Sequence, residues 1–122
     1  MTEEKKDFFV SDISLSYQYT AGNATTRFLN KVAEGKLVAQ KCPKCSAVYV
    51  PPRGSCPRCG VATEEELELP DTGAVESFTI VHIPIPGNPI VPPYVSAMIR
   101  LDGADISFLH LIQEIDLADI RI

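Results

Sequence analysis

The stretch that decides the fold is Cys42-Pro-Lys-Cys45, followed after ten residues by Cys56-Pro-Arg-Cys59-Gly60. These pairs contain all four cysteines of the chain. A C-x2-C pair reverses direction in a tight turn, which lets two thiolates face one ion. The proline inside each pair and Gly60 after the second pair suit such turns. Two of these turns on neighbouring hairpins predict a closed, four-thiolate metal site.

Four cysteines in such pairs have three other possible uses besides zinc binding. Structural disulfides need an oxidising compartment, and the chain shows no export signal. A redox-active C-x-x-C normally occurs once, beside a βαβ pattern that this sequence lacks. An iron–sulfur cluster can use four thiolates, but regular paired turns favour zinc. We therefore expect structural Zn²⁺ on four ligands, with no open position for catalysis: Cys42, Cys45, Cys56 and Cys59.

Upstream of the cysteines, residues 24–34 are expected to form a short helix. Asn23 is a plausible N-cap, and Gly35 ends the helical pattern. Phe28 and the apolar residues that follow it fall on one face. Such a short helix is marginal alone, so it needs a surface to pack against. Either it docks on its own ribbon, or it forms a partner-binding surface together with Tyr17 and Tyr19.

Downstream of the cysteines, the pattern is one of β structure. Residues 47–50 can form a short strand between the two cysteine pairs, and the glutamate-rich run 64–69 reads as a solvated edge strand. Residues 84–93 hold five prolines and cannot join a ladder. Further strands are expected at 75–83, 94–101 and 105–113, then a connector at 114–119 and the start of a strand at 120–122.

The expected fold is mainly β, with a helix, a zinc ribbon and a small antiparallel barrel or sandwich. We expect three pieces: an N-terminal segment and helix at 1–36, the ribbon at 37–68 and the barrel at 69–122. A small closed barrel needs about five strands, and the sequence ends where a fourth strand would begin. This leads us to expect a barrel left incomplete at the C-terminus, with residues missing after Ile122 or an edge open to a partner strand.

Composition and charge limit the classes of protein to which this chain can belong. Hydrophobic residues make up 45% and charged residues 22%, which are globular values. Residues 27–58 carry seven basic residues and one acidic one, for a net +6, whereas residues 59–122 carry two basic and eleven acidic ones, for a net −9. No apolar run could span a bilayer and the charged start is unlike a signal peptide, so a cytoplasmic location without membrane contact is expected.

The sequence shows no catalytic constellation. His82 and His110 both lie in predicted strands, where a lone histidine is usually packed or half-exposed rather than a base. There is no nucleophile elbow and no phosphate-cradling glycine loop. Neighbouring glutamates in the 64–69 run would point to opposite faces of a strand. We therefore expect a protein that is not an enzyme by itself.

The chain from about Tyr17 to Ile122 resembles a family of small proteins long known as a domain of unknown function. That family has an N-terminal helical segment, a rubredoxin-like zinc ribbon and an OB-fold domain. Its four ribbon cysteines correspond to the four cysteines of this chain. The other matching motifs are Arg27-Phe-Leu, Glu34-Gly-Lys, Gln40-Lys-Cys42, Tyr49-Val-Pro-Pro-Arg53, Leu69-Pro-Asp-Thr-Gly73, Pro93-Tyr94, Leu101-Asp-Gly-Ala-Asp105 and Phe108-Leu-His-Leu111.

The resemblance implies a role in acyl-CoA and lipid metabolism. Members of the family bind thiolase-superfamily enzymes, including lipid-transfer-protein-like thiolases, and a similar domain acts with an aldolase and a hydratase in bacterial steroid side-chain degradation. By this resemblance, the chain is a non-catalytic accessory subunit in a hetero-oligomer. It would stabilise a thiolase-like enzyme and help to bind or channel a coenzyme A thioester shared by the complex.

Candidate contact residues follow from this implied role. The basic segment offers Arg27, Lys31 and Arg53 to the CoA phosphates. A partner interface is expected at Tyr17, Tyr19, Phe28, Pro92 and Tyr94. The alternative is a single-stranded nucleic-acid module, because zinc ribbons and OB-folds often bind nucleic acid. The acidic barrel region and its few aromatic residues make nucleic acid the less favoured partner.

Overall fold

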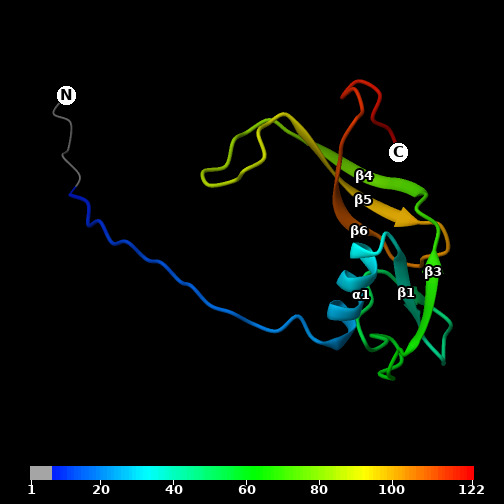
Figure 1. Ribbon diagram of the computed structural model, residues 1–122. Helices are drawn as coiled ribbons and strands as arrows, with labels where there is room; N and C mark the ends of the chain where they lie inside the picture. The colour runs from blue at the N-terminus through cyan, green and yellow to red at the C-terminus, as the bar shows by residue number, and fades with distance from the viewer. Residues whose placement is uncertain (1–6) are drawn as a thin grey trace.

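In the computed structural model, which describes residues 7–122, the chain forms a helix and two three-stranded antiparallel sheets (Figure 1). The first six residues of the predicted N-terminal segment lie outside this range. The mainly β class is thus confirmed. In chain order the elements are α1 (Asn23–Ala33), β1 (Leu37–Lys41), β2 (Val48–Tyr49), β3 (Glu65–Leu69), β4 (Gly73–Val81), β5 (Tyr94–Leu101) and β6 (Phe108–Ile112).

The first sheet has the strand order β2-β1-β3 and forms the ribbon. Its central strand, β1, buries Val38, Ala39 and Gln40. The strand β3 lies at the edge, as its charge pattern predicted, and its glutamates are exposed. These charged side chains discourage another chain from adding to this edge. The register pairs Leu37 with Leu69 across β1 and β3, which fixes where the chain leaves the ribbon.

The second sheet has the order β4-β5-β6 and does not close into a barrel within the part of the chain that the structure describes, in agreement with the expectation of a barrel left incomplete. Closure requires the first and last strands of a sheet to pair, whereas here β4 and β6 are both edges. The strand expected at 120–122 is wrong, because no edge within residues 7–122 pairs with these residues. The strands expected at 75–83 and 105–113 begin or end a few residues away from β4 and β6.

The helix α1 begins one residue earlier than expected. Gly22, not Asn23, occupies the N-cap position, with φ 78°, and its carbonyl accepts the first helical hydrogen bond from the N–H of Thr26 at 3.0 Å. Glycine adopts this positive φ without steric cost, so it takes the cap that Asn23 was predicted to provide. At the other end, the N–H of Gly35 donates to Val32 O and that of Lys36 to Lys31 O, both at 2.9 Å, which closes the helix.

One apolar core joins the two sheets. Its buried members come from β1, β2, β3, β5 and the residue after β2: Ala39, Val48, Val50, Leu69 and Leu101. Phe28 of α1 packs against this cluster, so the helix does dock on its own ribbon. Leu29 and Val32 of the same helix stay 54% and 42% exposed. The ribbon and the second sheet therefore share one core, and the boundary between residues 68 and 69 stays a prediction.

Hydrogen bonds also connect the two sheets. The N–H of Val48 donates to Asp105 Oδ2 at 2.7 Å, and the N–H of Asp105 donates back to the carbonyl of Val48 at 3.0 Å. Nearby, the hydroxyl of Thr72 donates to Asp102 Oδ2 at 2.6 Å, while the N–H of Asp102 donates to Thr72 O at 3.0 Å. These reciprocal pairs hold the turn between β5 and β6 against the ribbon and against the β3–β4 connection.

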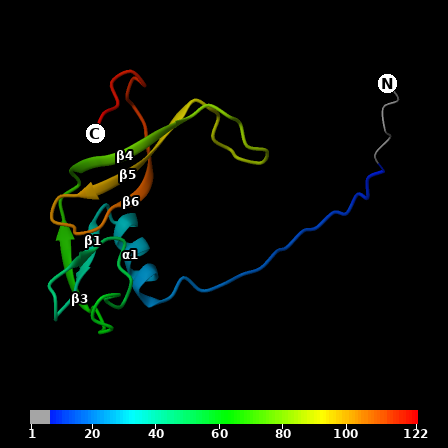
Figure 2. The same cartoon turned by 180° about the vertical axis from the view of Figure 1, so that it is seen from behind.

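Two segments project from this body. The N-terminal arm, which we define as residues 7–21, is extended and leads away from the sheets in both views (Figures 1 and 2). The proline-rich loop 82–93 between β4 and β5 extends beyond the second sheet (Figure 2). Within residues 7–122, no helix has the length and apolar character to cross a membrane.

Candidate metal centre

The two cysteine pairs form turns of the same construction. The N–H of Ser46 donates to Cys42 O at 3.0 Å, and the N–H of Gly60 donates to Cys56 O at 2.9 Å. In each turn the residue after the second cysteine has a positive φ, 63° at Ser46 and 67° at Gly60. The sequence pattern predicted both reversals, although it marked the second more clearly because glycine favours this conformation.

The turns bring the four cysteines together at one point. Their Sγ atoms all lie within 4.8 Å of one another, and those of Cys45 and Cys56 are 3.7 Å apart. Tetrahedral zinc with Zn–S bonds near 2.3 Å places its sulfur ligands about 3.8 Å apart, so the donor set fits this metal. Cys42 and Cys56 are buried and Cys45 is exposed, which sets the site at the edge of the ribbon. The expected ligands are thus arranged to bind one structural metal ion.

Backbone donors prepare the thiolates for a cation. The N–H groups of Lys44 and Cys45 both reach Cys42 Sγ at 3.4 Å. Burial opposes ionisation of Cys42, but these donors outweigh it and lower its pKa. In contrast, burial and the neighbouring thiols raise the pKa of Cys59 to about 12. Four thiolates cannot ionise together without a positive charge between them, and a divalent metal ion supplies that charge.

Tyr49 supports the site from the adjacent strand. Its hydroxyl lies 3.2 Å from Cys56 Sγ, and both side chains are buried. This hydrogen bond, helped by the N–H groups of Cys59 and Arg58, lowers the pKa of Cys56 to about 6 despite burial. The same contact raises the pKa of Tyr49 to about 12, so the phenol stays protonated and donates a hydrogen bond to the thiolate. Hydrogen bonds of this kind orient metal ligands.

Gln40 ties the loop between the cysteine pairs to the sheet. Its side chain is buried, and Oε1 accepts hydrogen bonds from the N–H of Gly54 at 3.0 Å and from the hydroxyl of Thr63 at 3.1 Å. A buried amide with two donors is well satisfied. Sequence reasoning assigned no role to Gln40, Tyr49 or Asp105. Each of these residues belongs to a motif that the chain shares with the family it resembles, and these motifs were the signal that could have identified them.

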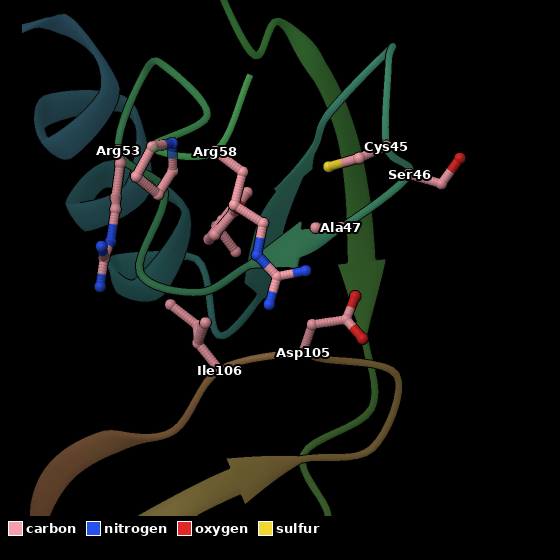
Figure 3. A pocket seen from close by; sticks show the side chains of 9 residues that line it. Cys45, Ser46, Ala47, Arg53, Arg58, Asp105 and Ile106 are labelled. Atoms are coloured by element: carbon pink, nitrogen blue, oxygen red, sulfur yellow. The ribbon is translucent and has the colours of Figure 1, made fainter. Parts of the chain in front are cut away.

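Two arginines border a pocket of 400 Å³ beside the metal centre (Figure 3). Arg53 lies over the ring of Tyr49, with its Cζ 5.9 Å from the ring centroid. Arg58 enters the same pocket from the second cysteine turn, and Asp105 and Ile106 close it from the β5–β6 connection. Within residues 7–122, neither arginine has a carboxylate oxygen within 4.0 Å. Both guanidinium groups are therefore available to an anion.

The other two predicted CoA contacts lie on α1 and are engaged in ion pairs. Arg27 Nε is 3.2 Å from Glu66 Oε1, and Lys31 Nζ is 2.9 Å from Glu34 Oε2. The hydrogen bond to Glu34 raises the pKa of Lys31 and lowers that of Glu34. Both pairs are largely exposed, and exposed pairs contribute little stability. The structure therefore does not gather Arg27, Lys31 and Arg53 into one ready-made site.

Comparison with known proteins gives matches to two family models that together span residues 30–122. The first, described as the ChsH2 rubredoxin-like zinc ribbon domain, covers residues 30–65. The second, the ChsH2 C-terminal OB-fold domain, covers residues 66–122. A solved structure of a DUF35 protein of unknown function from Sulfolobus solfataricus shares 30% identity over 78% of this chain and 72% of its own, with a TM-score of 0.65. The chain belongs to the DUF35 family.

Further relatives show what this DUF35 chain is similar to. A DUF35 domain-containing scaffold protein of Methanocaldococcus jannaschii is 38% identical over 73 residues, or 58% of this chain and 52% of the relative. A probable enoyl-CoA hydratase alpha subunit of Thermomonospora curvata is 36% identical over 66 residues, or 54% of this chain and 20% of the relative. The matches thus span about half and a fifth of these two relatives. A solved structure described as the Ltp2-ChsH2(DUF35) aldolase is 28% identical over 85% of this chain and 81% of its own, with a TM-score of 0.68.

The predicted interface residues fall in three separate places on the DUF35 fold. Tyr17 and Tyr19 lie in the exposed arm, with ring centroids 6.0 Å apart. Phe28 is half-buried against the core. Pro92 and Tyr94 are half-buried where the proline-rich loop enters β5. The structure thus keeps the arm tyrosines free for a partner and gives Phe28 a structural contact as well.

The remaining candidates offer little chemistry. His82 lies just after β4 and His110 in β6, and both are exposed. His110 Nδ1 is 3.1 Å from the carbonyl of the next residue, and across residues 7–122 neither histidine hydrogen-bonds to a nucleophilic side chain. The aromatic residues Phe78 and Phe108 of the second sheet are half-buried, whereas nucleic-acid binders of this fold expose such rings for base stacking.

Proposed function

We propose that this DUF35 chain is a non-catalytic accessory subunit of a thiolase-like enzyme of the thiolase or aldolase type. The observation that carries the proposal is the likeness to the DUF35-containing Ltp2-ChsH2 aldolase over 85% of this chain. The archaeal relative described as a scaffold protein supports the same role. The chain would stabilise the enzyme subunit and help to bind or channel its acyl-CoA substrate.

The chemistry of the described residues supports a non-catalytic role. Four thiolates fill the coordination sphere of a tetrahedral metal ion and leave no position for substrate. The centre would therefore hold the ribbon together rather than activate water. The two histidines are exposed, on and beside the strands of the second sheet, and within residues 7–122 neither has a partner that could make it a positioned base.

An apolar groove supports the presence of a partner. It has a volume of 560 Å³ and lies between α1 and the second sheet, where Phe28, Leu29 and Val32 face residues of β4, β5 and β6. Exposed apolar side chains on the proline-rich loop, among them Ile83 and Val91, extend this character to a second region. Apolar surface of this extent on a small protein favours contact with another protein or ligand.

CoA contact would centre on Arg53, with Arg58 beside it in the 400 Å³ pocket. Phosphate groups bind guanidinium through charge-assisted hydrogen bonds, and within residues 7–122 neither arginine forms an ion pair, although Asp105 lines the same pocket. Arg27 and Lys31 would join only after leaving their ion pairs with Glu66 and Glu34, which are weak enough to exchange for a polyanion.

Co-purification and kinetics test this proposal. The full chain is co-expressed with a thiolase-superfamily subunit of the same organism, and the activity of that subunit is measured with and without it. A stable complex with higher activity or a longer half-life supports the accessory role. An enzyme subunit that is fully active and stable alone, with no measurable complex, contradicts it.

Charge reversal then tests the CoA contact within the same complex. Arg53→Glu should raise the KM for acyl-CoA about tenfold, because it removes a charge-assisted contact, while kcat changes little. Arg121→Glu, on the exposed C-terminal segment, is the matched control and should leave the KM unchanged. If the KM for acyl-CoA is the same in both variants, the chain would act as a structural tether that does not contact CoA.

A further inference from the structure

The arm contains a run with strict two-residue periodicity that the fold does not use. Over residues 13–20 the sequence reads Ile-Ser-Leu-Ser-Tyr-Gln-Tyr-Thr, so every second side chain is large and apolar or aromatic and every other one is small or polar and uncharged. Successive side chains of a strand point to opposite faces, so this alternation produces one apolar and one polar face. Isoleucine, tyrosine and threonine also favour strands. The run has the pattern of a half-buried β-strand.

The structure leaves this strand pattern without a sheet. Residues 13–20 are assigned to no strand, and Ile13, Leu15, Tyr17 and Tyr19 are between 76% and 85% exposed. Within the described chain, no backbone N–H or carbonyl of residues 7–21 takes part in a backbone hydrogen bond. The arm thus presents an apolar stripe and a complete row of free backbone donors and acceptors.

From residue 13 onward, the arm also lacks the features that keep exposed strands apart, although Asp12 directly precedes the alternating run. Residues 13–26 carry no charge, and no proline interrupts them. The chain's own edge strand, β3, shows the opposite design, with Glu65, Glu66 and Glu68 directed to solvent. An uncharged, proline-free alternating segment is prone to aggregate when exposed, and natural proteins cover or charge such edges. This contrast indicates that another sheet covers the arm in the working assembly.

The position of the arm indicates what covers it. It leads away from both sheets of its own chain (Figures 1 and 2). It also precedes residues 30–122, the part matched by the two family models. A segment that extends beyond its own sheets with unpaired backbone groups can pair with the edge of a partner's sheet.

We infer that residues 13–19 add as an edge strand to a β-sheet of the enzyme subunit, an inference that rests on the proposed accessory function. Backbone hydrogen bonds would supply affinity, and the four alternating apolar side chains would enter a strip of pockets beside that edge. Seven residues in a strand extend about 23 Å, enough to pair with a full-length edge strand. The tyrosines at 17 and 19 become specificity side chains of an added strand.

Hydrogen exchange at single-residue resolution tests this inference on the full chain, free and in complex with the co-expressed thiolase-superfamily subunit. In an added edge strand, alternate amides point to the partner and the intervening ones point to solvent. Amides at 13, 15, 17 and 19, or those at 14, 16 and 18, should therefore exchange at least about tenfold more slowly in the complex. Protection of consecutive amides would indicate a helix and overturn the inference.

Proline variants test the backbone directly. Ser16→Pro and Tyr17→Pro each remove one N–H, and one of these two neighbouring groups must point to the partner edge. One proline variant should therefore bind about tenfold more weakly than its matched control, Ser16→Ala or Tyr17→Ala. If both prolines bind as well as their alanine controls, the strand model is wrong.

The outcomes separate this inference from the function on which it rests. If the wild-type chain forms no complex, the accessory role fails and the inference fails with it. If the complex forms but the arm amides exchange as in the free chain, the accessory role stands and the added strand is wrong. Protection of the arm in the isolated chain, together with a dimer mass, would assign the arm to a second copy and overturn the enzyme edge.

Discussion

Asp105 and Val48 connect the two sheets of this protein through a reciprocal pair of hydrogen bonds. The N–H of Val48 donates to Asp105 Oδ2 at 2.7 Å, and the N–H of Asp105 donates to Val48 O at 3.0 Å. One partner lies in β2, between the two cysteine pairs, and the other in the connection from β5 to β6. The short strand β2 therefore connects the metal centre to the contact between the ribbon and the OB-fold sheet.

Asp105→Ala should lower the free energy of unfolding by about 1–2 kcal/mol, because the N–H of Val48 loses a charged acceptor. Asp105→Asn keeps an acceptor oxygen of the same shape and should recover at least half of the loss. Urea unfolding at constant zinc concentration measures both changes. Equal stability of the alanine and wild-type chains would mean that the backbone bond alone holds the joint.

Tyr49→Phe should weaken zinc binding by about tenfold or more, because the phenol donates to the Cys56 thiolate and orients this ligand. Competition with a chromophoric chelator measures the affinity. Tyr94→Phe, far from the cysteines in β5, is the matched control and should bind zinc as the wild type does. A phenylalanine variant with unchanged affinity would show that the contact packs Tyr49 without tuning the metal.

Acidification should release zinc, because each ligand binds only as a thiolate. The hydrogen bond from Tyr49 lowers the pKa of Cys56 to about 6, so the thiolate survives to a lower pH than an ordinary cysteine would. Removing the phenol should therefore move the midpoint of zinc release to a higher pH. A zinc-release titration of wild type and Tyr49→Phe checks the sign, and a shift to lower pH would refute this explanation.

Cys42→Ser and Cys59→Ser should each reduce the zinc content well below one ion per chain and destabilise the ribbon. A structural zinc site supplies much of the folding free energy of such a small unit. Ser107→Ala, outside the ribbon, should retain full zinc content and serve as the control. Metal analysis and thermal unfolding give the two readouts. Retained zinc with unchanged unfolding in the cysteine variants would exclude a four-cysteine site.

Gly60→Ala should cost about 1–2 kcal/mol of stability, because Gly60 adopts φ 67° and a side chain disfavours this conformation. No atom of the described residues 7–122 lies within 4 Å of the position that the added methyl group would take, so the backbone alone causes the loss. Ser46→Gly at the equivalent position, φ 63°, should be neutral or stabilising. A stabilised Gly60→Ala variant or a destabilised Ser46→Gly variant would contradict the shared construction of the turns.

The metal centre was predictable because its geometry is local. Two residues between cysteines fix each turn, and the ten residues between the pairs suffice for a hairpin. The same holds for the end of α1, where Gly35 marks the reversal. Its start was missed because Gly22 and Asn23 both suit a cap, and only the backbone angle at Gly22 distinguishes them.

Features that depend on distant residues were not predictable. The strand at 94–101 was read correctly, and a barrel left incomplete was expected, but the order of the strands depends on which edges pair. Periodicity indicated that Tyr49 lies in a strand, yet not that its hydroxyl reaches Cys56. The count of basic residues grouped Arg27 and Lys31 with Arg53. In the structure, these two side chains of α1 instead form ion pairs with Glu66 and Glu34. Pairing across the fold, rather than composition, decides each of these.

The strand β3 has a consequence for how the chain can be divided. The two family models meet between residues 65 and 66, inside a strand that spans Glu65–Leu69 and pairs along all of β1. A fragment that ended at residue 65 would lose nearly all of this strand from its ladder, and Leu69 from the common core. The ribbon and the OB-fold sheet are therefore two matches in sequence but one unit in packing.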